Sequence, residues 1–352
     1  MSGDLAIRLQ AKIDGKTKPP GALGELEALA LKIGLIQQTL TPSLHQPTLV
    51  VFAGDHGIAA EGVSAFPAEV TAQMVANFAA GGAAVNVFAR SNGLALKIVD
   101  AGVAADLSAH APLIHRKIRP GTSNSLHGPA MTAQEAHAAL AAGAAIIDEL
   151  HGDGSNVVGL GEMGIANTSA AAMIMALLLE LPVEQCTGAG TGVTDGALAR
   201  KIDVLTRAVA RAHQAMAGRP GLMLAQDTLT QGALTQRVLE EVGGFEIGMM
   251  AGAMARAAHH RMVILIDGFI ATAALLLAKT MDASVLECCV FCHQSDERGH
   301  RLMLEHLDAP PLLKLGMRLG EGTGAALAFP LIRSAVAFLN EMASFEEAGI
   351  SG

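Results

Sequence analysis

The sequence predicts an α/β fold with a mainly parallel sheet, and two observations support this prediction. Apolar, strand-like runs alternate along the chain with alanine-rich helical runs, which is the order of strand–helix–strand units. Apolar residues make up 51% of the chain and many are alanines, which suits helices packed closely on a parallel sheet. With 352 residues the chain is long for one core, so we expect a large domain and a smaller one.

The expected elements follow from these two kinds of run. The clearest strands are Thr48–Gly54, Ala95–Gly102, Asn156–Gly161, Met262–Gly268 and Val285–Cys292. The clearest helices between them are Ala68–Ala80, Thr132–Leu150 and Ile247–His260. Both ends of the chain also look helical, at Leu23–Gln38 and Pro330–Gly349, and lie outside the alternation. We therefore predict a small helical domain from residues 1–35 and 326–352, beside a large α/β catalytic domain over residues 36–325.

Composition excludes several classes of protein. The net charge is −9 and no dense basic run occurs, which argues against nucleic acid as a partner. The most apolar stretch, Met262–Ala278, is short and contains Asp267, so it predicts a buried strand and helix rather than a membrane span. The charged, amphipathic N-terminus has no secretory signal, which predicts a cytoplasmic protein.

Three of the four cysteines, Cys288, Cys289 and Cys292, lie in one apolar run. Its end, CVFCH, matches the haem attachment motif, but that motif requires export and no export signal is present. A zinc site would require a second Cys/His pair at suitable spacing, and none stands out. We interpret the run as a buried strand and expect no metal.

Polar residues follow each expected strand, at the sheet edge where ligands of open parallel sheets bind. These residues lie in loops after the strand-like runs or in the late glycine-rich loop, and they are Asp55, His56, Glu162, Asn167, Thr168, Asp267, His293, Ser295, Glu297 and Glu321. The sequence alone leaves open whether the Asp55–His56 pair contributes to catalysis or only builds its loop. Glu321 lies between two glycines and is a candidate general base.

The run Gly159–Gly164 matches the dinucleotide pattern G-x-G-x-x-G. Glu162 stands within it, where a carboxylate would repel a pyrophosphate. The acidic residue that normally ends the next strand is also missing, because Glu180 falls at an expected helix end. A single phosphate at the start of a helix, with Asn167, Thr168 and Ser169 as donors, fits the sequence better.

Long motifs in order along the chain resemble one family. They are KPPGALGELE, AGDHGIAAEGVSAFPAEVTAQMVANFAAGGAAVNV, GLGEMGIANTSAAA, GAGTGVTD, VGGFEIGMMAGAM, ILIDGFIATAA, HQSDERGH and MRLGEGTGAALAFPLI. Together they are similar to nicotinate-nucleotide–dimethylbenzimidazole phosphoribosyltransferase, an enzyme of cobalamin lower-ligand synthesis. The resemblance extends over nearly the whole chain.

The resemblance implies a reaction and an architecture. The 5-phosphoribosyl group would pass from nicotinate mononucleotide to 5,6-dimethylbenzimidazole, giving nicotinate and α-ribazole 5′-phosphate with inversion at the anomeric carbon. The resemblance also implies a doubly wound, Rossmann-like sheet, a small helical domain formed by both termini, a homodimeric state and the use of no metal or organic cofactor.

The resemblance also implies roles for particular residues. Glu321 would be the general base, and Glu162 would lie near the ribose or the reaction centre. The phosphate and ribose would contact Ile165, Ala166, Asn167, Gly190, Lys201, Asp267 and Ser295. The base would rest among Phe66, Met74, Met163 and Leu319. The methionines are equally consistent with ordinary core packing.

The chain departs from the family pattern at several positions, which are Ala22, Glu25, Ala189, Cys292, Gln294 and Arg298. None removes a candidate catalytic group, but the identity of the accepted base stays open. Two further alternatives remain at this point. One is a nicotinamide-dependent oxidoreductase that uses the Gly159–Gly164 loop, and the other is a mononucleotide sensor without catalysis.

Overall fold

A computed structural model describes residues 2–108, 112–188, 190, 192, 195–217 and 228–351, so Ala189 lies outside the described residues. Six parallel strands form one sheet in the order β3-β2-β1-β4-β5-β6. The strands are β1 (Thr48–Gly54), β2 (Ala95–Gly102), β3 (Leu113–His115), β4 (Val157–Met163), β5 (Val263–Ile266) and β6 (Cys289–Phe291). This is the strand order of a Rossmann fold, so the prediction of a doubly wound parallel sheet is confirmed.

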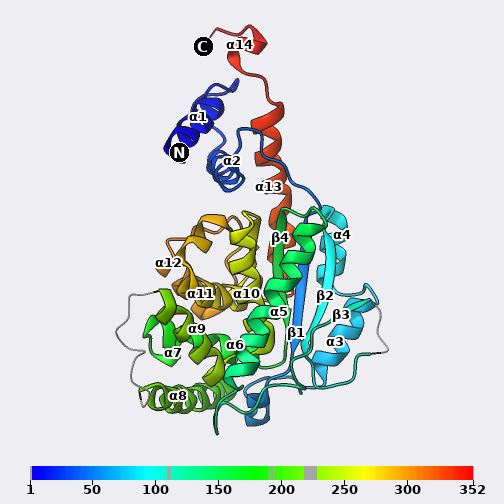
Figure 1. The fold of residues 1–352 in the computed structure, drawn as a ribbon, viewed down its shortest axis with the longest axis vertical. Coiled ribbons are helices and arrows are strands. Elements are labelled where there is room, and N and C mark those ends of the chain that lie inside the picture. Colours follow the sequence, from blue (N-terminus) through cyan, green and yellow to red (C-terminus); the bar gives the residue numbers. More distant parts are fainter. Residues whose placement is uncertain are drawn as a thin grey trace.

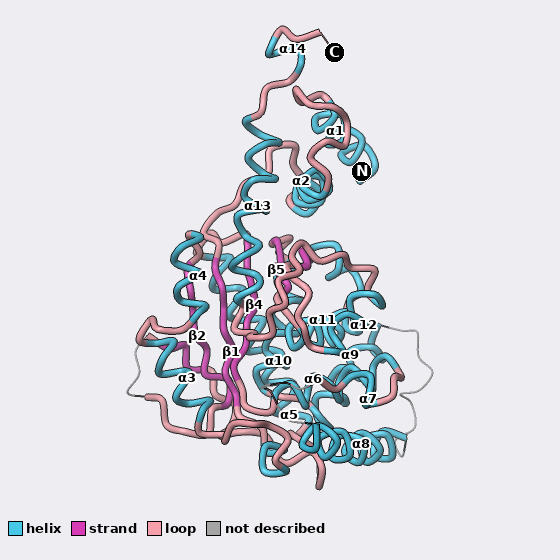
Figure 2. The backbone as a smooth tube through the Cα atoms, turned by 180° about the vertical axis from the view of Figure 1, so that it is seen from behind, coloured by secondary structure: helices cyan, strands magenta, loops and turns pink. Residues whose placement is uncertain are grey.

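Helices cover both faces of the sheet (Figures 1 and 2). On one face α10 (Phe245–His259) packs on the central strands and against α5 (Ala133–Gly152) and α11 (Phe269–Met281). On the other face lie α3 (Val70–Ala79), α4 (Ala84–Asn92) and α13 (Thr323–Glu341). The remaining described helices are α1 (Ser2–Asp14), α2 (Glu25–Ile36), η1 (Gly57–Glu61), α6 (Asn167–Leu179), α7 (Val183–Cys186), α8 (Asp195–Ala217), α9 (Thr228–Val242), η2 (Ala283–Cys288), α12 (Arg298–His306) and α14 (Phe345–Ala348).

The central strands are buried along their length because helices cover them on both sides. All seven residues of β1 are buried, and so are the first six of β4. Such strands read as continuous apolar runs, which is why β1 has the predicted bounds. β2 also has the predicted bounds, although only its last five residues are buried. The edge strand β3 has only three residues and is partly exposed, so no apolar run predicted it.

One predicted strand was wrong in its first half. Residues Ala283–Cys288 form the 3₁₀ helix η2, and only Cys289–Phe291 joins the sheet. The Asp282 side chain accepts a hydrogen bond from the Ser284 backbone N–H and so caps the helix. A short buried apolar run does not distinguish a helix from a strand by its periodicity, which explains the error.

Helices from both ends of the chain meet beyond the amino ends of the strands (Figure 1). Here α2 packs on α13, and the Asn340 side chain donates to the carbonyl oxygen of Pro42, shortly before β1. Lys16 pairs with Ser344 in an isolated antiparallel bridge. The helix α13 runs without interruption across residue 326 and also packs on β4. Division of the chain at that residue therefore stays a prediction.

The apolar segment Met262–Ala278 forms β5 and most of α11, and both are buried, as predicted. Within the described residues, α13 is the one helix that is long and apolar enough to cross a membrane. In its most apolar window 56% is buried inside the protein, and core helices of folded domains commonly show this pattern.

Candidate active site

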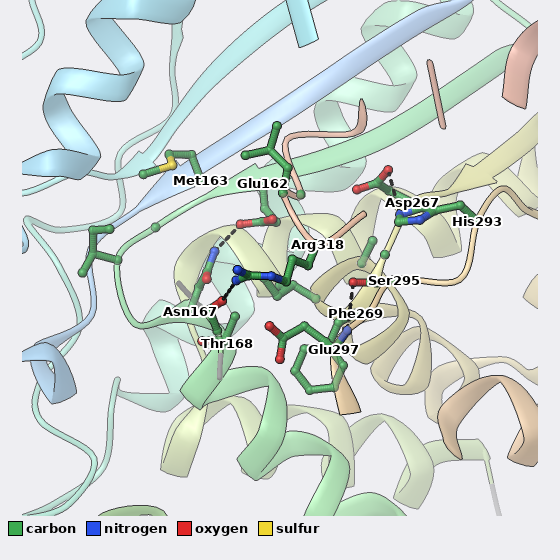
Figure 3. A pocket seen from close by; sticks show the side chains of 18 residues that line it. Glu162, Met163, Asn167, Thr168, Asp267, Phe269, His293, Ser295, Glu297 and Arg318 are labelled. Atoms are coloured by element: carbon green, nitrogen blue, oxygen red, sulfur yellow. Dashed lines mark hydrogen bonds and ion pairs between the residues drawn. The ribbon is translucent and has the colours of Figure 1, made fainter. Parts of the chain in front are cut away.

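A pocket lies at the carboxyl ends of β4, β5 and β6, beside the start of α6 (Figure 3). It encloses about 670 Å³ including its mouth, which is within the usual size of a small-molecule site. The predicted residues that line it are Glu162, Met163, Ile165, Asn167, Gly190, Asp267, Ser295 and Leu319. The other lining residues are Gly164, Thr168, Gly268, Phe269, Ile270, Ala271, His293, Glu297, Arg318 and Gly320.

Two further predicted residues lie directly behind the lining. Ala166 is the N-cap of α6 and has a left-handed backbone with φ of 75°. Lys201 is buried, and its Nζ donates to Oγ1 of Thr168 at 3.1 Å. Both therefore support the wall formed by α6 and the Gly190 turn.

The three other predicted residues do not line this pocket either. Glu321 follows the lining residue Gly320, but its Oε2 accepts a hydrogen bond from the Val85 backbone N–H at 3.3 Å, at the start of α4. Phe66 is 52% exposed. Met74 belongs to α3 and is half-buried against the hydrophobic core. In this chain the four side chains predicted to hold the base are therefore divided, since only Met163 and Leu319 lie in the pocket.

A cluster of buried carboxylates occupies the sheet side of the pocket. Burial, with further contributions from Asp267, Glu246 and Glu321, raises the pKa of Glu162 to about 8. The Asn167 amide donates to Glu162 Oε2, which opposes that shift but does not cancel it. This raised pKa favours the protonated form of Glu162 near neutral pH, in which the carboxyl group can donate a hydrogen bond.

Asp267 is held at the end of β5 by backbone donors. Burial raises its pKa, while His293 and the N–H groups at the start of α13 oppose the rise. One of these, the Ala325 N–H, donates to Oδ1 at 3.0 Å, and His293 Nε2 lies 3.7 Å from the same oxygen. The carboxylate thus ties β5 and the loop after β6 to α13.

A second part of the pocket, formed by the start of α6 and the Gly190 turn, is suited to an anion. Arg318 donates to the carbonyl oxygen of Gly190 at 2.9 Å, and Lys201 lies behind the same turn. Burial lowers the pKa of Lys201 to about 8, although Glu297 opposes the change. The first turn of α6 also faces the pocket through Asn167 and Thr168. Two cations beside a helix N-terminus can bind a phosphate.

Sequence reasoning missed Arg318 and Phe269. Arg318 stands three positions before Glu321 in the same glycine-rich loop, so its place in that loop was an available signal. Phe269 starts α11 directly after Asp267 and Gly268, but its apolar context is also that of a core residue. His293 and Glu297 were identified as strand-end residues, and both line the pocket.

The glycines of the dinucleotide pattern have a packing role here. Gly159 and Gly161 lie inside β4, whereas the dinucleotide fingerprint places its glycines in the turn after the strand. A Cβ on Gly161 would collide with the Glu321 backbone, and one on Gly164 would collide with the Gly54 carbonyl. The pattern therefore allows close backbone contact and does not form a pyrophosphate loop.

The Asp55–His56 pair lies outside the pocket lining. His56 Nε2 is 2.6 Å from Glu246 Oε1, and both side chains are buried. Asp55 Oδ2 accepts a hydrogen bond from the Ala104 N–H at 2.8 Å. These contacts join the ends of β1 and β2 to α10, so the pair builds the loop.

The four cysteines are buried and form no disulfide. Burial raises the pKa of the Cys289 thiol above its usual value, as expected for a small hydrophobic side chain in a core. Across the described residues, no group of three or more His, Cys, Asp or Glu side chains is arranged to hold a metal ion.

Comparisons with known proteins agree with the motifs. A family model described as Phosphoribosyltransferase matches residues 1–350. The nicotinate-nucleotide–dimethylbenzimidazole phosphoribosyltransferase of Cupriavidus taiwanensis is 58% identical over 350 residues, covering 99% of this chain and 96% of that protein. The enzyme of the same name from Dechloromonas aromatica is 54% identical over 347 residues, covering 99% and 96%.

A solved structure is also similar to this chain in both fold and sequence. The crystal structure of CobT from Thermus thermophilus superposes with a TM-score of 0.91 at 43% identity, covering 99% of both chains. Sequence and structure thus agree along nearly the whole chain, and the resemblance seen in the motifs is confirmed. The chain belongs to the nicotinate-nucleotide–dimethylbenzimidazole phosphoribosyltransferase family.

Proposed function

We propose that this protein transfers the 5-phosphoribosyl group of nicotinate mononucleotide to 5,6-dimethylbenzimidazole, releasing nicotinate and forming α-ribazole 5′-phosphate. The observation that carries the proposal is the 58% identity, over 99% of the chain, to a relative named for that activity. The pocket supports it, because it combines an anion-binding wall with a cluster of carboxylates at the carboxyl edge of the sheet.

The chemistry requires little assistance at the leaving group. The glycosidic bond to a pyridinium is activated, since nicotinate departs with a neutral ring nitrogen. The enzyme must hold an imidazole nitrogen near C1′ and accept the proton of the other nitrogen. Inversion follows when the acceptor and the leaving nicotinate lie on opposite faces of the ribose.

Each part of the pocket has a proposed role in this reaction. The phosphate binds at the start of α6, near Lys201 and Arg318. Glu162, Asp267 and Ser295 lie around the ribose. Protonated Glu162 is suited to donate a hydrogen bond to a ribose oxygen, because its pKa is near 8.

Glu321 is the proposed general base. Burial raises its pKa above the usual value, which favours proton uptake. Its left-handed backbone, with φ of 63°, stands between Gly320 and Gly322, which also have positive φ. A non-glycine residue held in this conformation is uncommon and consistent with a functional constraint. In this role Glu321 exchanges its bond to Val85 for one to the acceptor base.

A homodimer in the cytoplasm is the proposed state of the protein. The dimer is supported by the exposure of large apolar side chains, among them Leu319 at 55% in the pocket lining and Leu315 at 56% nearby in sequence. Light scattering tests this state, and a mass equal to one chain of 36.0 kDa would contradict it.

The decisive experiment is a turnover assay. The purified protein is incubated with nicotinate mononucleotide and 5,6-dimethylbenzimidazole, while nicotinate release and product mass are followed. Glu321→Gln should lower kcat by about 10²–10⁴-fold, the usual contribution of a positioned general base. Glu341→Gln, an exposed glutamate at the end of α13, is the matched control and should leave kcat unchanged.

The assay also separates the alternatives. Product from another base, such as adenine, with none from dimethylbenzimidazole would assign the same transfer to a different acceptor. No product with any base would contradict the transferase proposal. The oxidoreductase alternative has lost its support, since the glycines of Gly159–Gly164 are explained by packing.

A further inference from the structure

A buried histidine connects two loops of the pocket. His300 lies in the first turn of α12 and is 0% exposed. Its Nδ1 accepts a hydrogen bond from the Ser295 backbone N–H at 2.8 Å, and its Nε2 lies 3.0 Å from Thr272 Oγ1. Thr272, on α11, in turn donates from Oγ1 to the Gly268 carbonyl at 2.8 Å. Ser295 and Gly268 both line the pocket, whereas His300 and Thr272 do not.

These hydrogen bonds form a relay from Ser295 through His300 and Thr272 to Gly268. The donors and acceptors fix the direction of every hydrogen bond in this relay. A backbone N–H can only donate, so Nδ1 of His300 carries no proton and the ring proton is on Nε2. The Gly268 carbonyl can only accept, so the Thr272 hydroxyl proton points to it. The Thr272 oxygen is then free to accept from Nε2–H. No group in the relay is left unsatisfied, which makes it rigid.

The relay needs a neutral imidazole. A protonated ring would offer a second donor to the Ser295 N–H and break that bond. Burial, assisted by the neighbouring His293, lowers the pKa of His300 to about 3. The ring therefore stays in the required form throughout the neutral range.

We propose that His300 and Thr272 are positioning residues for the nucleotide, holding the loop after β6 in register with the loop after β5. This inference rests on the proposed function. The relay fixes the backbone of Ser295, whose Oγ accepts from the Glu297 N–H at 3.4 Å and so retains its own proton for a substrate oxygen. At the other end it fixes Gly268, next to Asp267. Figure 3 shows Ser295 between Asp267 and Glu297.

Two substitutions of the histidine separate the two ends of the relay. His300→Asn places an amide oxygen near the position of Nδ1, so it keeps the acceptor for Ser295. His300→Gln reaches the position of Nε2 and keeps the donor to Thr272, but it loses the Ser295 acceptor. We expect His300→Gln to raise the KM for nicotinate mononucleotide by about 10-fold, the loss of one buried hydrogen bond, and His300→Asn to raise it less. The KM for dimethylbenzimidazole should change by less than about twofold in both.

Substitution of the threonine tests the relay from its other end. Thr272→Val removes the hydroxyl with little change of volume and should also raise the KM for the nucleotide, while Thr272→Ser should restore it. Thr235→Val is the matched control, because Thr235 is equally buried and its Oγ1 donates to the Leu277 carbonyl at 2.9 Å, away from the pocket lining. It should lower Tm as Thr272→Val does but leave the KM unchanged.

The outcomes separate this inference from the function on which it rests. If wild type turns over and all these variants keep its KM while Tm falls, the relay is only structural and the inference is wrong. If wild type gives no product, the proposed function fails. Calorimetric titration with nicotinate mononucleotide then decides the inference on its own, since weaker binding by His300→Gln than by His300→Asn supports it and equal binding overturns it.

Discussion

At the residue scale, the pocket depends on carboxyl groups that the fold places out of water. Glu162 lies near Asp267, Glu246 and Glu321, and all four are buried. Charges of one sign in a confined site disfavour one another, so the group least compensated takes up a proton. Burying several carboxyl groups together lowers the stability of the fold, which is consistent with a functional requirement for these groups.

Glu162→Gln is expected to stabilise the fold while lowering activity. In the folded protein the pKa of Glu162 is raised to about 8 from an ordinary 4.5, so wild type loses stability as the pH rises through that interval. Glutamine has no such dependence and can still accept the bond from Asn167. The gain in free energy of unfolding should therefore be greater at pH 8 than at pH 5, by roughly 1–3 kcal/mol. Urea unfolding at both pH values measures it, and a gain independent of pH would contradict the assignment.

His56→Gln should destabilise the protein more at pH 6 than at pH 9. Burial would lower the pKa of His56, but the Glu246 carboxylate 2.6 Å away raises it above 6.5. For a base with a raised pKa, the stabilisation is complete below the unfolded value and is lost as the pH rises through the folded one. We expect a cost of about 1–3 kcal/mol at pH 6, measured by urea unfolding. His137→Gln, exposed on α5, is the control, and an equal cost at both pH values would refute the pairing.

At the scale of elements, α13 joins the sheet to the terminal helices although it contains Pro330. A proline inside a helix has no N–H to donate, so the carbonyl four residues earlier loses its partner. That carbonyl belongs to Ala326, and the Asn92 side chain at the end of α4 donates to it at 3.0 Å. A side chain from a neighbouring helix thus replaces the missing bond and allows α13 to continue.

A double-mutant cycle tests this compensation. Asn92→Ala should cost about 1 kcal/mol of unfolding free energy in wild type, because it leaves the Ala326 carbonyl without that donor. In a Pro330→Ala background the new N–H at residue 330 bonds Ala326, so the cost should fall by at least about 0.5 kcal/mol. Ser91→Ala, one position earlier on α4, is the control. Additive effects of Asn92 and Pro330 would contradict the compensation.

At the scale of the whole molecule, the pocket and the terminal helices lie at opposite ends of the strands. The pocket is at the carboxyl ends of β4 to β6, while α1, α2 and α14 lie beyond the amino ends (Figure 1). A nucleotide bound in the pocket would contact loops that follow three strands and would therefore stabilise the large α/β unit.

Nicotinate mononucleotide should therefore raise Tm, and NAD should raise it much less. At a concentration of 100 times Kd a ligand of the native state adds about 2.7 kcal/mol, which corresponds to a shift of a few degrees for a chain of this size. Thermal unfolding with each nucleotide at matched concentration measures the difference. A larger shift with NAD would restore the dinucleotide interpretation of Gly159–Gly164.

The sequence by itself determined the fold class and the family. The buried strands β1 and β2 have the predicted bounds, and the polar residues after β4, β5 and β6 gather in one pocket as expected. These features depend on residues close together in the chain, because strand and helix periodicity and strand-end loops are local patterns. The motifs that identified the family are likewise contiguous.

Only the tertiary structure decided how distant residues meet. It turned Glu321 towards Val85, placed Arg318 on the Gly190 turn and joined His300 to Thr272. It also showed that Gly161 makes room for the Glu321 backbone. Each contact joins elements that are separated in the chain, and its geometry depends on how helices pack on the sheet. Local patterns carry no information about that packing, so the sequence identified the candidate groups and the fold set their orientation.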